Sequence, residues 1–572
     1  MIIKNIEIKN YRGLNNLDIK FNEINSYILG DNGVGKSSIL DLLNIIFNKG
    51  SFNESDFYNL DDKIEIVIQF KLSDLEIGYF EDIFDTNSDN LISIVALQEN
   101  INGRIDFFHK ETGLTIPYSK IKNLPFVYYN SVKAPEEMNF KKSKTAGKFL
   151  NAIIEKYIKD YKIKSEDVVD EQKVNEVANS INKLLNKISI IQDLDIAAKL
   201  ENDAIRLIPQ LIGLSNSDNI SINNMGSGIR YMSYVFFEIL NTIMKKIDNN
   251  KEITFINKDG KRVLPVIIAL DEPEIHLHPY MQRNLMNNVK KIINNEDNNF
   301  LELLKTCFDI DGIIGQLIIC THSPNILSNN YKEYIRIFKE NDQIFTKSGI
   351  DIAFETDEEK HLLAHIQDIK ECFFSNVVLI YEGISEIGSI PYFAQKLNID
   401  LDYLKIATID AGGKTSIPLI EKIIKNFGIK VICVMDKDDE NDLNPEYIYT
   451  NDRDFECDIV NKLILNDAID ELIEVIELYE KNEKNKDFQK TKLENNKEKL
   501  GIQISIDKNY TINQAIATEN KELIKLILIS WLWKTKNMVR GRLLGEQLSR
   551  NNIPEVYKIS LEKAKELANN NV

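Results

Sequence analysis

The stretch that decides the fold of this chain is Gly30–Ser37, with the sequence GDNGVGKS. It matches G-x-x-x-x-G-K-[ST], in which the backbone N–H groups of a glycine-rich turn and the following helix N-terminus bind phosphate. The apolar run Tyr27–Leu29 precedes the glycines, and a segment with helical spacing, Ser38–Phe47, follows them. A plain glycine-rich turn is the alternative, which the flanking strand and helix disfavour. The sequence therefore predicts a nucleotide-binding loop.

The predicted contacts of this loop are divided between backbone and side chains. Lys36 is expected to reach the outer phosphates, and Ser37 is expected to bind Mg²⁺. The expected cofactor is thus ATP with one Mg²⁺. The other predicted nucleotide-binding residues of the loop are Asn32, Gly33, Gly35 and Ser38.

A second apolar run predicts the acidic side of the nucleotide site. Val263–Leu270 is the most strand-like run in the chain, and Asp271 and Glu272 follow it. Continuously apolar strands are typical of the middle of a parallel sheet covered on both faces. We expect Asp271 to hold the water shell of Mg²⁺ and Glu272 to polarise the attacking water. A further apolar strand, Leu317–Cys320, ends in Thr321–Pro324, with the sequence THSP.

The order of these motifs resembles that of ABC-type ATPases of the RecF, SMC and Rad50 group. By that resemblance, His322 is the switch histidine that senses the γ-phosphate. His276 and His278 lie just past the Asp271 strand end, and we interpret both as structural.

The same resemblance implies that two heads close around two nucleotides, each donating a signature helix to the other. The candidate signature is Asn224–Arg230, in which Ser227 and Gly228 would contact the nucleotide. Ile229 stands where the ABC pattern has a second glycine. This departure predicts slow hydrolysis, or nucleotide sensing in place of turnover.

A separate set of carboxylates occurs in the C-terminal part of the chain. The buried-strand run Asn376–Tyr381 ends in Glu382, and Glu386 follows four positions later, on the same face of a helix that starts there. Further strands are predicted at 406–410 and 431–435. Three strand–helix units predict a small parallel sheet whose functional residues gather at the carboxyl ends of the strands.

These carboxylates predict a metal site. Crowded carboxylates repel one another, and oxygen-only ligation selects hard ions such as Mg²⁺ or Mn²⁺. Two such ions activate water and stabilise the leaving oxygen in phosphodiester cleavage. The alternative is a solvated acidic turn, which Asp-x-Asp alone would favour. The predicted metal ligands are Glu382, Glu386, Asp436 and Asp438.

Glu-Gly, then a Gly-Gly turn at 412–413, then Asp-x-Asp resembles the Toprim domain. The resemblance implies catalytic roles for Glu382, Asp436 and Asp438. It also implies that Glu456 is a metal ligand, with Asp458 as the alternative. Either Lys536 or Arg540 would stabilise charge on the scissile phosphate; the alternative for these two is ordinary helix-surface charge.

An ABC head followed by a Toprim domain resembles the OLD (overcoming lysogenization defect) family, shared by the nuclease subunit of Gabija phage defence and several retron-associated effectors. The resemblance implies an ATP-regulated, metal-dependent DNA endonuclease in anti-phage defence, with two Mg²⁺ or Mn²⁺ ions in the Toprim site. It also implies a homodimer or higher homo-oligomer, with a partner protein or bound RNA as further candidates.

The expected architecture is α/β, with an ABC-type P-loop head interrupted by helices and a Toprim domain with its own helical insertion. Residues 146–205 show helical spacing, which predicts a dimerisation arm or, alternatively, helices packed on their own head. The expected boundaries are 1–145 and 206–350 for the head, 351–374 for a linker, and 375–572 for the Toprim domain with an insertion at about 466–530.

Composition restricts the class of protein. With 572 residues, 43% hydrophobic and 28% charged, the chain is typical of a soluble protein with two or more domains. No apolar run approaches the ~18 residues that span a bilayer. The five cysteines lack C-x-x-C spacing, which favours the reducing cytoplasm and no zinc ribbon. The net charge of −18 weighs against broad electrostatic binding of nucleic acid.

Two other functions compete with an endonuclease. A RecF- or SMC-like ATPase acting as a non-nucleolytic clamp or scaffold in DNA repair has no use for the four carboxylates Glu382, Glu386, Asp436 and Asp438. A primase would normally show a zinc ribbon, and a topoisomerase needs a tyrosine nucleophile in a separate domain. The carboxylate set therefore favours the nuclease.

Overall fold

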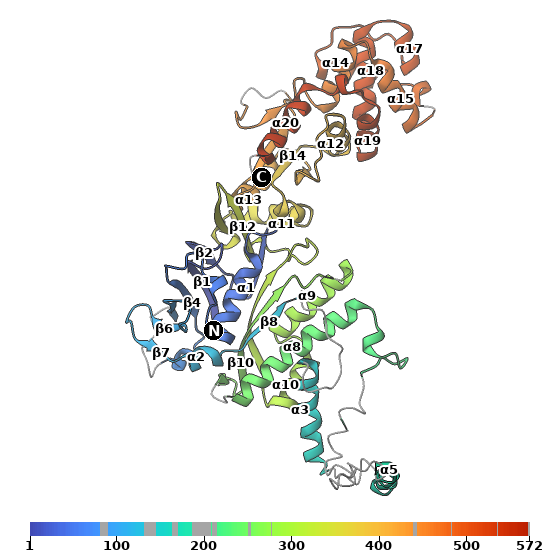
Figure 1. The fold of residues 1–572 in the computed structure, drawn as a ribbon. Coiled ribbons are helices and arrows are strands. Elements are labelled where there is room, and N and C mark those ends of the chain that lie inside the picture. The colour runs from blue at the N-terminus through green and yellow to red at the C-terminus, as the bar shows by residue number, and fades with distance from the viewer. Residues whose placement is uncertain are drawn as a thin grey trace. The chain divides into compact units, whose positions relative to one another are not determined.

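The computed structural model of the protein describes residues 1–80, 90–130, 145–162, 170–185, 208, 214–249, 253–275, 277–438, 443–481, 483–534 and 536–569. The chain forms two compact units. The first contains Met1–Ile28 and Gly35–Ile326, and the second contains Leu29–Val34 and Leu327–Val572. Both units combine helices with sheets (Figure 1), which confirms the predicted α/β class.

The first unit contains an antiparallel sheet in the order β2-β1-β4-β5-β6-β7. Alternation of apolar and polar residues in β1 and β4 gives each strand one mostly buried face. The strands are β1 (Ile2–Lys9), β2 (Leu17–Lys20), β4 (Ile64–Lys71), β5 (Leu91–Gln98), β6 (Asp106–His109) and β7 (Thr115–Ile116).

The first unit also contains parallel strands in the order β3-β11-β10-β8. They are β3 (Asn25–Gly30), β8 (Phe126–Asn130), β10 (Arg262–Asp271) and β11 (Gly312–Cys320), and β9 (Phe255–Ile256) pairs antiparallel with β10. In β10, every residue after Arg262 is buried. The prediction of a central parallel strand over 263–270 is confirmed, because β10 has a parallel neighbour on each side.

Helices pack against these parallel strands. α1 (Lys36–Asn44) contacts β8, β10 and β11, α9 (Pro279–Ile293) contacts β11, and α8 (Ser227–Asn249) contacts β8. The remaining helices of the unit include α2 (Tyr118–Asn123) and α10 (Asn298–Phe308).

Two described helices fall within the predicted insertion 146–205. α3 (Thr145–Asp160) packs on α8, where the rings of Phe149 and Phe237 have centroids 6.4 Å apart. α5 (Glu171–Leu185) exposes Val177 and Ile181. Residues 163–169 and 186–205 of the predicted insertion lie outside the described residues.

The second unit contains a four-stranded parallel sheet in the order β15-β14-β16-β17. The strands are β14 (Val377–Tyr381), β15 (Ile406–Asp410), β16 (Lys430–Met435) and β17 (Ile448–Tyr449), with α12 (Ile384–Lys396) and α13 (Ile417–Asn426) between them. The three predicted strand–helix units are confirmed. β17 is an additional strand, too short for a periodic signal.

Ahead of this sheet the second unit has the hairpin β12 (Tyr334–Glu340) and β13 (Gln343–Ser348), then α11 (Thr356–Ile369). Arg336 of β12 is 5% exposed and donates hydrogen bonds to the carbonyl oxygens of Phe427, Gly428 and Ser375. The hairpin is therefore fixed to the sheet by a buried charge.

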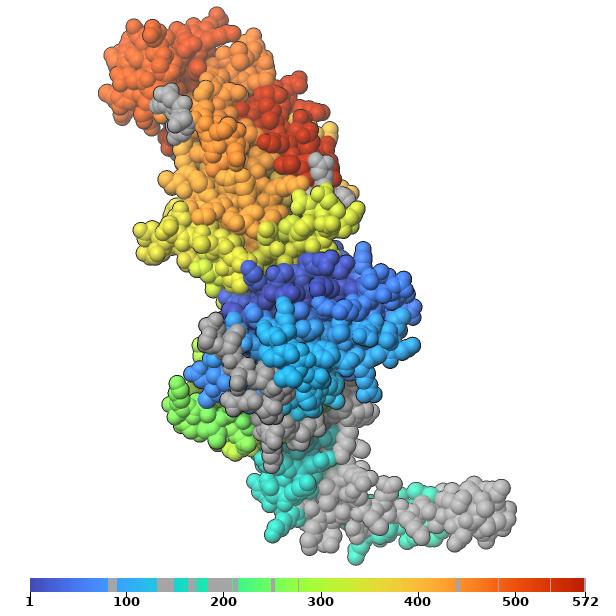
Figure 2. Space-filling view, turned by 90° about the vertical axis from the view of Figure 1, so that its left-hand side faces the viewer, coloured from blue at the N-terminus to red at the C-terminus, as the bar shows by residue number. Residues whose placement is uncertain are grey.

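The C-terminal helices share the core of the parallel sheet. α14 (Phe455–Leu465), α15 (Ile469–Tyr479), α16 (Lys490–Leu500), α17 (Ile512–Ala517), α18 (Lys521–Lys534), α19 (Met538–Gln547) and α20 (Glu555–Asn569) follow β17. One apolar cluster joins Leu379 and Val434 of the sheet to Leu472 and Trp531 of these helices. α20 contacts all four strands, and Figure 2 shows its dark red atoms against the orange surface of the sheet region.

α12 and α19 cross at backbone contact distance. A Cβ added at Gly541 would lie 2.1 Å from the Ser385 carbonyl oxygen, and one at Gly388 would lie 2.4 Å from the Met538 carbonyl oxygen. Ser389 Oγ donates to the Gly541 carbonyl oxygen at 2.8 Å. The contact therefore requires glycine on both helices.

None of the helices in the described ranges is long and apolar enough to cross a membrane.

Gly541→Ala is expected to destabilise the second unit, although alanine in a helix interior ordinarily stabilises by about 1 kcal/mol. The new methyl group meets backbone that cannot move without separating α12 from α19, so we expect a loss of about 1–3 kcal/mol in the free energy of unfolding. Urea denaturation measures this. Gly501→Asn is the control, because Gly501 has φ +62° and open space around its Cβ position. A stability equal to or above wild type for Gly541→Ala would contradict the close crossing.

Candidate nucleotide and metal sites

The predicted phosphate-binding loop leads from β3 to α1 through three glycines with positive φ. These angles are +146° at Gly30, +79° at Gly33 and +97° at Gly35. A Cβ at Gly35 would lie 2.6 Å from Leu14 Cδ2, and Gly33 has open space around it. Asn32 and Gly33 are exposed, whereas Lys36 is buried at the start of α1. The loop thus has the glycine-dependent shape that phosphate binding requires.

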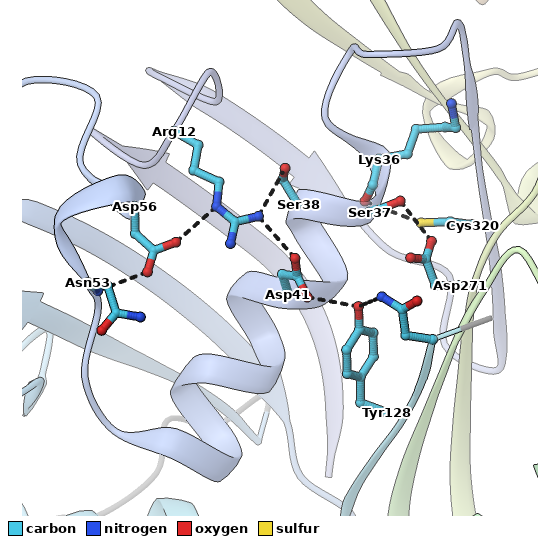
Figure 3. A network of polar contacts seen from close by, with 11 residues as sticks. Arg12, Lys36, Ser37, Ser38, Asp41, Asn53, Asp56, Tyr128, Asp271 and Cys320 are labelled. Atoms are coloured by element: carbon cyan, nitrogen blue, oxygen red, sulfur yellow. Dashed lines mark hydrogen bonds and ion pairs between the residues drawn. The ribbon is translucent and has the colours of Figure 1, made fainter. Parts of the chain in front are cut away.

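The two residues predicted to bind the nucleotide's Mg²⁺ lie side by side. Ser37 Oγ donates a hydrogen bond of 2.9 Å to Asp271 Oδ1. Burial raises the pKa of Asp271 to about 6, against the opposing effect of this hydrogen bond. Cys320 Sγ contacts the Lys36 carbonyl oxygen at 3.3 Å, which joins β11 to α1 at the same point (Figure 3).

The ends of β10 and β11 are linked through acidic residues. Glu272 has φ +46°, its N–H donates to the Cys320 carbonyl oxygen at 2.9 Å, and its Oε1 lies 3.4 Å from His322 Nε2. Glu274 Oε1 accepts hydrogen bonds from Thr321 Oγ1 at 2.9 Å and from the His322 backbone N–H at 2.6 Å. Burial raises the pKa of Glu274. Glu274 therefore holds the backbone of the predicted switch histidine.

An arginine that the sequence analysis did not select lies beside the loop. Arg12 Nε lies 2.9 Å from Asp56 Oδ1, and its Nη1 lies 3.0 Å from Asp41 Oδ2 and 3.4 Å from Ser38 Oγ. Tyr128 Oη donates to Asp41 Oδ1 at 2.8 Å, so the network continues to β8 (Figure 3). Arg12 is a lone arginine after a strand, and no spacing rule relates it to positions 41 and 56.

Ser227–Arg230 of the predicted signature form the first turn of α8, and Asn224–Gly226 precede the helix. A Cβ at Gly228 would lie 2.8 Å from Met281 Cε of α9, so α8 approaches α9 closely at this glycine. Ile229 is 44% exposed. The residue that departs from the ABC pattern is therefore at the surface.

His278 has a structural position, as predicted. It is the N-cap of α9, its Nδ1 accepts from the Tyr280 N–H at 3.5 Å, and its ring stacks on Tyr280 with centroids 5.7 Å apart. His276 lies outside the described residues.

The predicted metal ligands follow neighbouring strands of the second sheet. Glu382 follows β14 and Asp436 follows β16, and these two strands pair directly. The Asp436 N–H donates to Glu382 Oε2 at 3.1 Å. The Phe455 N–H, at the start of α14, donates to Asp436 Oδ1 at 3.2 Å. The two carboxylates thus meet at the carboxyl edge of the sheet, with a helix N-terminus beside them.

Two more of the predicted carboxylates are buried in the same group. Glu386 is 5% exposed, Glu456 is 2% exposed, and Asp436 is 9% exposed. Burial raises the pKa of Asp436 to about 8, and the negative charges of Glu382 and Glu456 act in the same direction. Burial also raises the pKa of Glu386 and of Glu456, and the charge of Asp436 further raises that of Glu386. The nearby positive charge is therefore too small to stabilise the ionised forms of these three carboxyl groups.

Lys536 forms an ion pair with this group, whereas Arg540 packs on an aromatic ring. Lys536 Nζ lies 2.8 Å from Glu456 Oε2, and the surrounding carboxylates raise the pKa of Lys536 although burial alone would lower it. Arg540 is 3% exposed, lies 4.1 Å from the Trp531 ring centroid and donates to the Trp531 carbonyl oxygen at 2.8 Å. Arg540 thus joins α18 to α19. Burial lowers the pKa of Arg540, and the charge of Glu456 is among the effects that oppose this.

Asp458 and Asp454 have backbone partners. Asp458 accepts from the N–H groups of Asn451 and Asp452, at 3.0 and 2.7 Å. Asp454 is the N-cap of α14, and Trp533 Nε1 donates to it at 2.7 Å. Asp454 also raises the pKa of Asp436 by its charge, after the larger effect of burial. Asp454 therefore belongs to the acidic group although the sequence analysis did not select it.

The donor set fits a hard divalent cation, because it consists of carboxylate oxygens with too little positive charge nearby. In the part of the chain that the structure describes, no three Asp, Glu, His or Cys side chains are already arranged around one metal position.

Comparison with known proteins matches two parts of the chain to families. The family described as AAA ATPase domain matches residues 1–146 and 126–327, which together are 327 of the 572 residues. The family described as overcoming lysogenization defect protein-like, TOPRIM domain matches residues 373–438. This second match ends at Asp438 and includes Glu382, Glu386 and Asp436.

Three relatives align with larger parts of the chain. Endonuclease GajA of Bacillus cereus (strain HuB5-5) is 23% identical over 430 residues, 68% of this chain and 58% of that protein. OLD nuclease of Thermus scotoductus (strain ATCC 700910 / SA-01) is 22% identical over 483 residues, 76% and 82% of the two chains. Septu protein PtuA of Bacillus thuringiensis is 22% identical over 345 residues, which are 57% of this chain and 73% of that protein. The chain thus spans less than two thirds of the first relative.

Glu274→Ala is expected to reduce ATP turnover by up to about 10²-fold and to leave ATP affinity close to wild type, because it releases the backbone of His322 and no predicted phosphate contact. Phosphate release and nucleotide titration measure the two quantities. Glu302→Ala, an exposed position on α10, is the matched control. Unchanged turnover in Glu274→Ala would mean that His322 is positioned by other groups or is not needed.

Proposed function

This chain belongs to the AAA ATPase domain family and carries an overcoming lysogenization defect protein-like TOPRIM domain, and we propose that it is a DNA endonuclease that depends on divalent metal and is controlled by ATP. The observation that carries the proposal is the buried carboxylate group with Lys536 at the carboxyl edge of the second sheet. A scaffold ATPase has no use for that group. The names of the relatives, two of them nucleases, support the same activity.

In the proposed nuclease site, Glu382, Asp436, Glu386 and Asp438 hold two Mg²⁺ or Mn²⁺ ions, with Glu456 as a further ligand. The ions would activate water and stabilise the leaving oxygen. Glu382 and Asp436 are placed for this by the ends of paired strands. Lys536, already charged beside Glu456, would stabilise the negative charge of the scissile phosphate.

In the proposed nucleotide site, Lys36 and the loop glycines bind the phosphates, while Ser37 and Asp271 hold Mg²⁺. Glu272 would orient the attacking water and His322, 3.4 Å from it, would sense the γ-phosphate. Ser227 and Gly228 at the start of α8 would act on the nucleotide of a second copy, which makes the active form a homodimer or a higher oligomer.

We place the activity in defence against phage, on the resemblance to the Gabija nuclease subunit. The substrate is DNA, and a partner protein or a bound RNA is a further candidate component. ATP controls cleavage only if it binds two states of the protein with different affinity. Ile229, which stands where the ABC pattern has a second glycine, favours control by occupancy over rapid turnover.

Asp436→Asn is expected to reduce cleavage of supercoiled plasmid in Mg²⁺ or Mn²⁺ by at least about 10²-fold, because it removes one charged ligand from the proposed metal site. Its ATP affinity should remain that of wild type. Agarose gels of plasmid forms measure cleavage, and Asp467→Asn, an exposed aspartate of the same unit, serves as control. Wild-type cleavage by Asp436→Asn would remove the nuclease assignment.

The cleavage rate of the Glu272→Ala protein is expected to depend on ATP concentration, either rising or falling, although hydrolysis is blocked. Glu272 acts on the attacking water, so its loss leaves nucleotide occupancy intact. Lys36→Ala should weaken ATP binding and lose the dependence. Plasmid cleavage across an ATP titration, with the oligomeric state checked by light scattering, measures the effect. A flat response in an intact oligomer would exclude control by occupancy.

A further inference from the structure

A lysine outside the predicted site reaches into the acidic group. The turn from β15 to α13 contains Gly412 at φ +68° and Gly413 at φ +131°, and Asp410 Oδ1 accepts the Gly412 N–H at 2.8 Å. This glycine-dependent turn places Lys414 Nζ 2.6 Å from Asp438 Oδ2. β15 pairs with β14, so the turn lies at the same carboxyl edge as Glu382.

Lys414 acts on more than one of the carboxylates. Burial raises the pKa of Glu382, and the charge of Lys414 opposes that rise more strongly than the charge of Lys536 does. Asp438 also faces Arg453, whose Nη2 is 4.0 Å from Asp438 Oδ1. The two lysines thus divide the acidic group: Lys536 neutralises the Glu456 side, and Lys414 neutralises the Glu382–Asp438 side.

A lysine ammonium and a divalent cation compete for the same carboxylate oxygen, because both need its lone pairs and its charge. Asp438 stands in a left-handed conformation, with φ +45° and its N–H donating to the Arg453 carbonyl oxygen at 2.8 Å. Its backbone is therefore fixed, and the partner of its carboxylate is what can change. Lys414 is 23% exposed at its side chain, so its flexible stem has solvent into which to move.

We propose that Lys414 is a resident counter-ion of the nuclease site, which occupies the cation position at Asp438 before metal binds, is displaced by the metal, and then contacts a backbone phosphate of the nucleic acid. This rests on the proposed metal-dependent nuclease function and adds to it a residue with two successive partners. The same ammonium would hold the empty site together and later replace part of the charge that DNA loses with its counter-ions.

The test is calorimetric titration of the full-length protein with Mn²⁺ in the absence of DNA and nucleotide. Lys414→Ala is expected to bind Mn²⁺ about 3- to 10-fold more tightly than wild type, because the competitor is gone. Lys414→Arg keeps the charge and should stay at or below the wild-type affinity. Lys437→Ala is the matched control: this exposed lysine between Asp436 and Asp438 forms no ion pair with the described residues, and its removal should change the affinity less.

A second measurement uses DNA binding in Ca²⁺, followed by fluorescence anisotropy of a labelled duplex. Lys414→Ala should bind the duplex several-fold more weakly while it binds metal more tightly, an opposition that an ordinary surface ion pair does not produce. Equal or weaker Mn²⁺ binding by Lys414→Ala, in a protein whose wild type binds Mn²⁺, overturns this proposal alone. Absence of Mn²⁺ binding in wild type overturns the proposed nuclease function together with it.

Discussion

The second unit is constrained by the burial of several carboxyl groups at the carboxyl edge of its sheet. Asp436, Glu386 and Glu456 are each more than nine-tenths buried, an arrangement that costs several kcal/mol per ion unless opposite charge lies close. Lys536 supplies that charge from the connection between α18 and α19. Lys536 lies two residues before α19, which crosses α12, the helix that carries Glu386. This crossing requires Gly541 and Gly388. The close packing of α12 on α19 and the charge balance between the buried carboxylates and Lys536 therefore constrain the same part of the second unit.

Each candidate site contains an acidic residue, beyond the end of a strand, whose backbone has the left-handed conformation. Glu272 and Asp438 have φ of +46° and +45°, a conformation that costs a non-glycine residue of order 1–3 kcal/mol. In each case the backbone N–H donates a hydrogen bond to a carbonyl oxygen, that of Cys320 for Glu272 and that of Arg453 for Asp438. The side chain then faces another functional side chain, the His322 imidazole for Glu272 and the Lys414 ammonium for Asp438. A strained backbone that orients one carboxylate toward a neighbouring side chain is therefore common to two sites with different proposed chemistry.

The strands and the strand-end acids could be predicted from the sequence, because an apolar run followed by a carboxylate is a local pattern. Such runs end at Asp271, Glu382 and Asp436. Parallel pairing places the end of β10 beside that of β11 in one sheet, and the end of β14 beside that of β16 in the other. The roles of Arg12 and Lys414 could not be predicted. They depend on contacts with Asp41 and Asp438, which lie 29 and 24 positions further along the chain. The sequence likewise could not show that Arg540 packs on the rings of Trp531 and Tyr479 while Lys536 contacts Glu456. Local periodicity carries no information on such pairings.

The charge of the chain bears on the order in which ligands would bind the proposed nuclease site. With a net charge of −18 and an edge lined by carboxylates, the metal-free site repels a phosphate backbone. Lys414 and Lys536 cannot offset this while each is held by a carboxylate of its own, Asp438 or Glu456. Divalent cations would change both the charge of the carboxylates and the pairing of the lysines. They neutralise the carboxylates and thereby release the ammonium groups from them. Under the proposed function, metal binding therefore precedes DNA binding, and the acidic composition of the chain becomes a means of keeping nucleic acid away from a site that is not yet loaded.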